Sequence, residues 1–117
     1  MAYIDGTIAA VPTGNKDAYI EFSKKVSPIF KEHGALNVVE CWGDDVPEGK
    51  TNSMYTATMC KPDETIVFSW ITWPSKAVRD TGMAKVMSDP RMSPETTPMP
   101  FDGQRMIIGG FETIFEA

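Results

Sequence analysis

The sequence predicts an α+β fold in which a four-stranded antiparallel sheet carries two helices on one face. The strongest evidence is the stretch from Thr65 to Trp73, where eight of nine residues are β-branched or aromatic, as is typical of strands. Apolar residues recur at helical spacing after Asn15 and again after Ser75. The expected order is therefore strand, helix, strand, strand, helix, strand, which is the ferredoxin-like βαββαβ arrangement.

The first half of the chain is expected to form a strand, a helix and a second strand. The first strand is predicted over residues 3–11. Asn15 is the expected N-cap of an amphipathic helix that ends at Gly34. Pro28 lies inside this helix and should remove a hydrogen bond and bend it. The second strand is predicted over residues 35–43.

The second half begins with a segment, residues 51–60, whose apolar residues fit neither the helical nor the strand period. It is interpreted as an irregular arm that contains an edge strand or a helical turn. Beyond the strand at 64–73, Ser75 is expected to cap a helix that Asp89 and Pro90 end. Gly82 should weaken this helix by about 1 kcal/mol relative to alanine.

The last part of the chain is predicted to be a surface loop followed by a strand. Three prolines between Arg91 and Pro100 are incompatible with regular structure. The final strand is expected over residues 104–115, with two adjacent glycines, Gly109 and Gly110, at its centre. Glycines inside a strand indicate a bulge or a group packed closely against the backbone.

Both faces of the predicted sheet are apolar. In the strand at 64–73, Ile66, Phe68 and Trp70 share one face, and Val67, Ile71 and Trp73 share the other. Two helices cover only one face, so the other would be a large exposed apolar patch in a monomer. We therefore expect a two-fold homodimer through the sheet face. Either the arm 51–60 or the proline-rich loop between Arg91 and Pro100 is expected to reach across to the partner. The predicted partner is thus a second copy of the chain.

Length and charge exclude several classes of protein. A chain of 117 residues with 42% hydrophobic residues is expected to form one domain, residues 1–117. The formal net charge of −5 makes a nucleic-acid partner unexpected. No apolar run is long enough to cross a membrane and the N-terminus has no signal-peptide pattern, so a cytoplasmic protein is expected. The two cysteines, Cys41 and Cys60, are interpreted as reduced structural thiols.

Several segments occur together, in one order, as they do in a known family. The chain resembles the YbaA-like family of bacterial domains of unknown function over nearly its whole length. The resemblance implies the dimeric α/β-barrel superfamily, and it implies no catalytic residue because the family has no established activity. The segments that carry it are Glu40–Trp42, Asp45–Pro47, Val67–Ile71, Trp73–Lys76, Arg79–Asp80, Met87–Met92 and Met99–Glu112.

Asp5 and Glu40 are the candidate catalytic residues, because each is a carboxylate inside a predicted strand. A cavity commonly forms between the sheet and the helices of such a fold, and a carboxylate buried in its apolar wall would have a raised pKa. Either residue would then be suited to proton transfer near neutral pH. The alternative is structural: each carboxylate faces Arg105 or a backbone donor, or reaches solvent at a sheet edge.

The candidate ligand-binding residues are Trp42, Trp70, Arg91 and Arg105. The tryptophans offer flat surfaces to an aromatic ligand, although core and dimer packing explain them equally well. Arg91 is either an anion anchor or the partner of Asp89, Asp80 or another subunit.

No metal or cofactor is expected. The single histidine, His33, lies at the end of the first predicted helix, where a surface position is common. Haem-handling relatives implied by the superfamily resemblance use a histidine near the second helix, and this chain has none between Ser75 and Pro90.

Two functions are consistent with the sequence. The first is binding or transformation of a small, partly apolar molecule without metal or haem, with Asp5 or Glu40 as proton carrier and Trp70 as a wall of the pocket. The alternative is a non-enzymatic interaction module whose sheet face serves dimerisation. A cavity of a few hundred Å³ beside Asp5 or Glu40 would favour the first.

Overall fold

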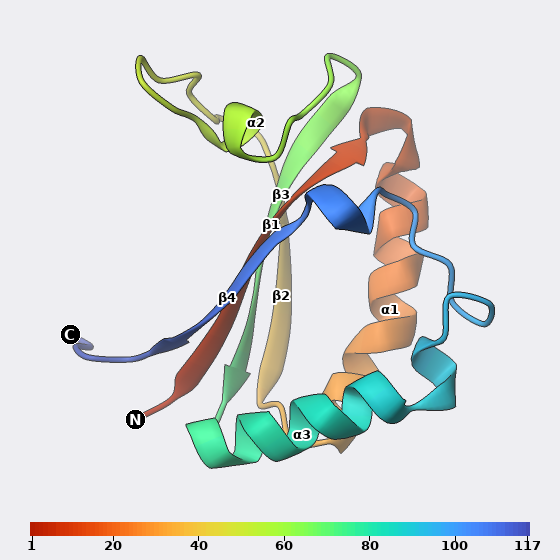
Figure 1. Ribbon diagram of the computed structural model, residues 1–117, viewed down its shortest axis with the longest axis vertical. Helices are drawn as coiled ribbons and strands as arrows, with labels where there is room; N and C mark the ends of the chain where they lie inside the picture. Colours follow the sequence, from red (N-terminus) through yellow and green to blue (C-terminus); the bar gives the residue numbers. More distant parts are fainter.

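The computed structural model describes all residues 1–117 and has an α+β architecture built on one antiparallel sheet (Figure 1). Its four strands pair in the order β2-β3-β1-β4, and each neighbouring pair is antiparallel. This open sheet fits the ferredoxin-like arrangement predicted from the order of elements. The strands are β1 (Tyr3–Pro12), β2 (Asn37–Trp42), β3 (Glu64–Trp73) and β4 (Ile107–Glu112).

Two long helices lie on the same side of the sheet, and a short one lies on the other side (Figure 1). The long helices are α1 (Lys16–Glu32) and α3 (Lys76–Ser88). The short helix is α2 (Met54–Ala57), and it belongs to the arm between β2 and β3. We call the side covered by α1 and α3 the helix face and the opposite side the open face. No helix is long and apolar enough to cross a membrane.

The helices differ at their N-termini. Ser75 caps α3 as predicted, and its hydroxyl accepts a hydrogen bond from the backbone N–H of Val78 at 3.2 Å. Asn15 is the N-cap residue of α1, as predicted, but its side chain makes no capping hydrogen bond. The Asn15 amide instead donates to the carbonyl of Pro100 at 2.8 Å. It therefore fastens the proline-rich loop to the start of α1.

The arm that the sequence left undecided contains a helical turn and no strand. Ser53 and Thr56 form a reciprocal capping box at the start of α2. Thr58 of the arm is fully buried, and Ala10 and Ile66 of the sheet are each only 2% exposed. Because Ala10 and Ile66 point to the open face, the arm covers that end of the face (Figure 1).

The last strand is shorter than predicted. It spans Ile107–Glu112 rather than 104–115, because a 3-10 turn at Gly103–Arg105 precedes it and residues 113–117 extend beyond the sheet. The two glycines do not form a bulge, since Gly109 and Gly110 continue the register with β1. A Cβ on Gly110 would lie 2.5 Å from the Tyr3 hydroxyl, so close packing is the reason for glycine there.

The proline-rich loop packs on the helix face of its own chain. The ring of Phe101 lies 5.6 Å from that of Tyr19 and 6.2 Å from that of Phe22, both on α1. This position, visible in Figure 1, is on the side of the sheet opposite the face through which dimerisation is expected. The loop instead completes the wall around the space between α1, α3 and the sheet.

The two faces of the sheet are both apolar, as predicted. On the helix face, Trp73 is fully buried at one end of the sheet, and Ala9, Val11 and Val67 form a core cluster with Tyr19 toward the other end. On the open face, Phe68, Ile107 and Phe111 stay 43%, 42% and 59% exposed. The uncovered part of this face forms a shallow hollow.

Candidate functional site

A cavity of about 290 Å³ lies between the helix face of the sheet, α1, α3 and the proline-rich loop. Its walls are mainly apolar and unusually rich in sulfur, since five of the eight methionines of the chain contribute to it. Methionine side chains are flexible and adapt to irregular shapes. The apolar wall is formed by Phe22, Val26, Phe30, Val38, Ile71, Met83, Met87, Met92, Met99, Phe101, Met106 and Ile108.

A row of polar side chains crosses the sheet beneath this cavity. Glu40 of β2 lies opposite Ser69 of β3, which lies opposite Thr7 of β1. Because directly paired residues point to the same face, all three turn toward the cavity. The hydroxyls of Thr7 and Ser69 form a hydrogen bond of 2.7 Å. The floor thus presents hydroxyl groups and the Glu40 carboxylate within a largely apolar cavity.

Glu40 is held by the hydroxyl of Tyr19, which donates a hydrogen bond of 2.7 Å to its carboxylate. The pKa of the Glu40 carboxyl is raised above its ordinary value because neighbouring protein atoms remove water from it. Hydrogen bonds from Tyr19 and Ser69 oppose this rise in pKa. Burial and the charge of Glu40 also raise the pKa of Tyr19, so its phenol stays protonated and donates. The shift in the Glu40 pKa has the direction predicted for a proton carrier, but the residue is exposed on the edge strand β2 rather than buried in the cavity wall.

Asp5 also borders the cavity, but its carboxylate is fully engaged. It is only 7% exposed and accepts from the indole N–H of Trp73 at 2.9 Å and from Nη2 of Arg79 at 2.8 Å. Arg79 Nε donates to the same carboxylate at 3.1 Å, and the Arg79 guanidinium lies 5.2 Å from the ring centre of Tyr3. The pairing that the sequence assigned to Arg105 is thus made by Arg79. This geometry ties β1, β3 and α3 together.

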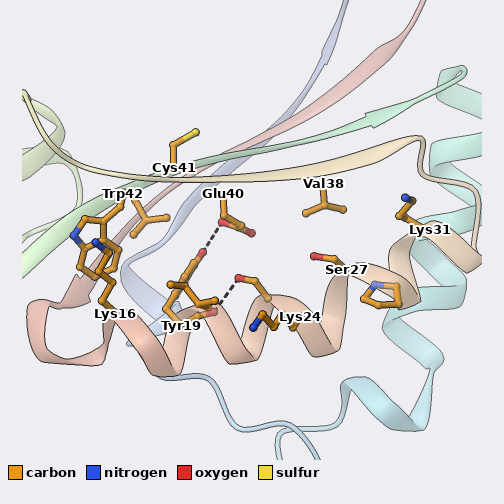
Figure 2. A pocket seen from close by; sticks show the side chains of 13 residues that line it. Lys16, Tyr19, Lys24, Ser27, Lys31, Val38, Glu40, Cys41 and Trp42 are labelled. Atoms are coloured by element: carbon orange, nitrogen blue, oxygen red, sulfur yellow. Dashed lines mark hydrogen bonds between the residues drawn. The ribbon is translucent and has the colours of Figure 1, made fainter.

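A second space lies outside the cavity, between α1 and the edge strand β2 (Figure 2). It has a volume of about 560 Å³ and is open to solvent. Three lysines of α1, Lys16, Lys24 and Lys31, line it, and we call it the lysine groove. The ring of Trp42 closes one end, with Lys16 Nζ 5.7 Å from the ring centre. Trp42 therefore borders the groove rather than the cavity.

The other predicted ligand-binding residues lie elsewhere. Trp70 touches the cavity edge, but its ring lies beside that of Phe68 on the open face, with a centroid distance of 5.8 Å. Arg91 pairs with Asp89 at 2.8 Å and with Glu32. Arg105 pairs with Glu64 at 2.7 Å and with Asp102 at 3.0 Å. Neither arginine lines the cavity or the lysine groove.

Four polar residues of the site were not singled out from the sequence. Tyr19 was assigned only to the apolar stripe of the first helix, and Thr7 and Ser69 only to alternating strand positions. The available signal was the register, since polar residues at the centre of three neighbouring strands form a row once the strands are paired. Arg79 belonged to one of the segments that carry the family resemblance.

His33 and the acidic residues do not form a metal site. His33 Nε2 lies 3.2 Å from the carboxylate of Asp89, which joins the end of α1 to the end of α3. No group of three or more histidine, cysteine, aspartate or glutamate side chains is placed to hold a metal ion. His33 thus has a structural contact at the far end of the cavity wall.

Comparison with known proteins places the chain among relatives of unknown function. Residues 2–103 match the family described as "Protein of unknown function (DUF1428)". The chain belongs to this family. It is 53% identical over 116 residues to the uncharacterized protein YbaA of Escherichia coli strain K12, with 99% of each chain covered. The same identity and coverage hold for uncharacterized YbaA of Shigella flexneri.

Proposed function

We propose that the protein binds a small, largely apolar molecule in the cavity between the sheet and its helices, with one polar group of the ligand at the Thr7–Ser69–Glu40 row. The cavity carries the proposal: about 290 Å³ of space with apolar walls and a few convergent polar groups. An interaction module with a solid sheet-helix interface would lack this space.

Glu40 is the proposed proton carrier if the bound molecule is transformed. Its carboxyl has a raised pKa and lies at the same cavity as the Thr7 and Ser69 hydroxyls. Asp5, the other predicted candidate, is held by Arg79 and Trp73, and we propose that it positions α3 against the sheet. No metal or haem enters this proposal.

We further propose that two copies associate through their open faces. Exposed aromatic and aliphatic side chains there support this, as does the absence of any long helix over that side of the sheet (Figure 1). In such a dimer the arm, residues 51–60, would border the contact. The partner of the chain is then a second copy, as the apolar strand composition predicts.

Ligand binding is tested by filling the cavity. Val26 is buried on α1 and lines the cavity, so Val26→Phe should abolish binding of neutral probes such as 1-octanol and small quinones. A probe at a hundredfold excess over its Kd should stabilise the wild type by about 2.7 kcal/mol. Thermal denaturation with and without each probe measures this effect.

Ile29→Phe is the matched control, because Ile29 is equally buried on α1 but does not line the cavity. Both variants should lose about 1–3 kcal/mol of stability from overpacking. Only Val26→Phe should lose the response to probes. Equal responses in the two variants, or no response of the wild type across the panel, would refute the proposed function.

A further inference from the structure

The cavity and the lysine groove share one thin partition. Tyr19, Val38 and Glu40 line both spaces. Tyr19 comes from α1 and Glu40 from β2, and the hydrogen bond between them bridges the gap between helix and edge strand (Figure 2). A displacement of these two side chains would join the two spaces. A ligand longer than the cavity could then extend into the groove.

The two spaces differ in charge. Inside the cavity, the negative charge of Asp5 is neutralised by Arg79, and the remaining wall is largely apolar. In the groove, Lys16, Lys24 and Lys31 face one acidic lining residue, Glu40. This positive excess is contrary to the net charge of −5 of the whole chain. It favours an anionic group at the groove end.

The groove lysines are available to an anion. Lys24 Nζ lies 3.1 Å from Glu21, but both side chains are more than two-thirds exposed, so this pair is weak. Lys16 lies over the Trp42 ring, and Lys31 forms no ion pair. Figure 2 shows the three lysines spaced along α1, with Tyr19 and Glu40 between them. Together they place three positive charges along the groove beside the partition.

We infer that the ligand of the cavity is an amphipathic carboxylate, whose alkyl or aryl part occupies the cavity and whose acidic group lies in the lysine groove. This inference rests on the proposed function, since it assigns a charge to the molecule that the cavity holds. The Tyr19 hydroxyl, which donates to Glu40, is positioned to donate to the carboxylate of the ligand instead.

The partition is suited to this exchange. The raised pKa of the Glu40 carboxyl means that it accepts a proton more readily than an ordinary glutamate. A nearby ligand carboxylate would raise that pKa further, because like charges disfavour the ionised form. Both effects favour the protonated form of Glu40, which would repel the anion less than the ionised form does.

The test compares two probes of equal chain length, sodium octanoate and 1-octanol, by isothermal titration calorimetry. Wild-type protein should bind octanoate more tightly than octanol, and added salt should weaken octanoate binding. The triple variant Lys16→Gln, Lys24→Gln, Lys31→Gln should weaken octanoate binding about tenfold. Its affinity for octanol should change less than about twofold.

A second triple variant controls for net charge. Lys25→Gln, Lys50→Gln, Lys85→Gln removes the same charge from exposed positions outside the groove, including the residue next to Lys24. It should leave both affinities within about twofold. Melting temperatures of both triple variants verify that the fold is intact.

The outcomes separate the inference from the proposed function. Equal affinity of wild type for the two probes, or an equal loss of octanoate affinity in both triple variants, overturns the inference and leaves the cavity as a site for neutral molecules. Absence of binding of both probes to the wild type overturns the proposed function and the inference together.

Discussion

Gly82 shows how a single residue fits two packed elements together. It lies on α3, where its backbone faces the ring of Trp73 and the carbonyl of His33. A Cβ at this position would lie 2.5 Å from the Trp73 ring and would also clash with the His33 carbonyl. The helix-weakening glycine predicted from sequence is therefore required by the close approach of α3 to the sheet and to the end of α1.

Gly82→Ala should lower the free energy of unfolding by about 2–4 kcal/mol, although alanine favours a helix by about 1 kcal/mol. The clash with Trp73 and the His33 carbonyl exceeds the gain in helix propensity. Urea denaturation followed by circular dichroism measures the change. Gly14→Ala is the control, because a Cβ on Gly14 meets no atom within 4 Å and should change stability little.

The two strand carboxylates have different surroundings despite similar sequence contexts. Asp5 meets Arg79 and Trp73, whereas Glu40 meets a tyrosine hydroxyl and no cation within ion-pair distance. The sequence predicted both as polar groups in apolar strands. It did not predict that Arg79 would pair with Asp5, because the two residues are 74 positions apart along the chain.

At the scale of elements, Arg105 joins three segments that are far apart in sequence. Its guanidinium donates to Glu64 at the start of β3 at 2.7 Å and to the carbonyl of Met59 in the arm at 2.9 Å. It also donates to Asp102 in the turn before β4. The Glu64 side chain is only 4% exposed, so this pair is shielded from solvent. The clamp fixes the arm against the sheet.

This clamp should make stability depend on pH. Arg105 lowers the pKa of Glu64 from 4.5 to about 2. A lowered folded-state pKa gives stability that is present above the unfolded value of 4.5 and is lost as pH falls through about 2. The free energy of unfolding of the wild type should therefore exceed that of Glu64→Gln by up to about 3 kcal/mol at pH 6. This difference in free energy should shrink as the pH falls from 4.5 to 2.

Denaturation by urea at pH 6, 4 and 3 measures this difference. Glu95→Gln, at an exposed residue without an ion pair, should give no difference from wild type at any of these pH values. A difference for Glu64→Gln that stays constant with pH would show that the Arg105 pair does not govern its titration.

Element order was more predictable than element ends. Strand composition and helical spacing identified β1, β3, α1 and α3, because these patterns extend over ten or more residues. The ends of β2 and β4 were placed too far out, because Ala35, Leu36, Ile114 and Phe115 continue the apolar pattern without a pairing strand. The fourth strand stops where its pairing with Tyr3 ends.

At the scale of the molecule, the apolar open face was predicted from the composition of β3. The cavity was expected from the architecture, but its wall could not be located, since most of its methionines lie on α3 and in the loop that follows. Met83 and Met87 lie four residues apart on one face of α3, whereas Met92 and Met99 lie in a segment without a strand or helix period. Their common orientation arises only when the loop packs on α1.

The proposed dimer predicts a specific effect of charge on the open face. Phe68→Asp places a carboxylate at an exposed position in the middle of that face, where burial in a dimer would be costly. The wild type should sediment at twice the chain mass of 12.9 kDa, and the variant should sediment as a single chain. Analytical ultracentrifugation at micromolar concentration measures both species.

Ile20→Asp is the control, because Ile20 is 43% exposed on α1, on the opposite side of the sheet. The Ile20→Asp variant should sediment at the same mass as the wild type. Wild type that sediments at the mass of one chain would refute dimerisation through the open face.

The sulfur-rich wall of the cavity has a consequence for how the protein responds to oxidants. Conversion of Met83 or Met99 to the sulfoxide would add a polar oxygen to an enclosure that otherwise suits hydrocarbon. Peroxide treatment should thus weaken the binding of apolar compounds in the cavity before it unfolds the chain. Reductase repair of the sulfoxides would restore that uptake, so the site could report the redox history of its surroundings.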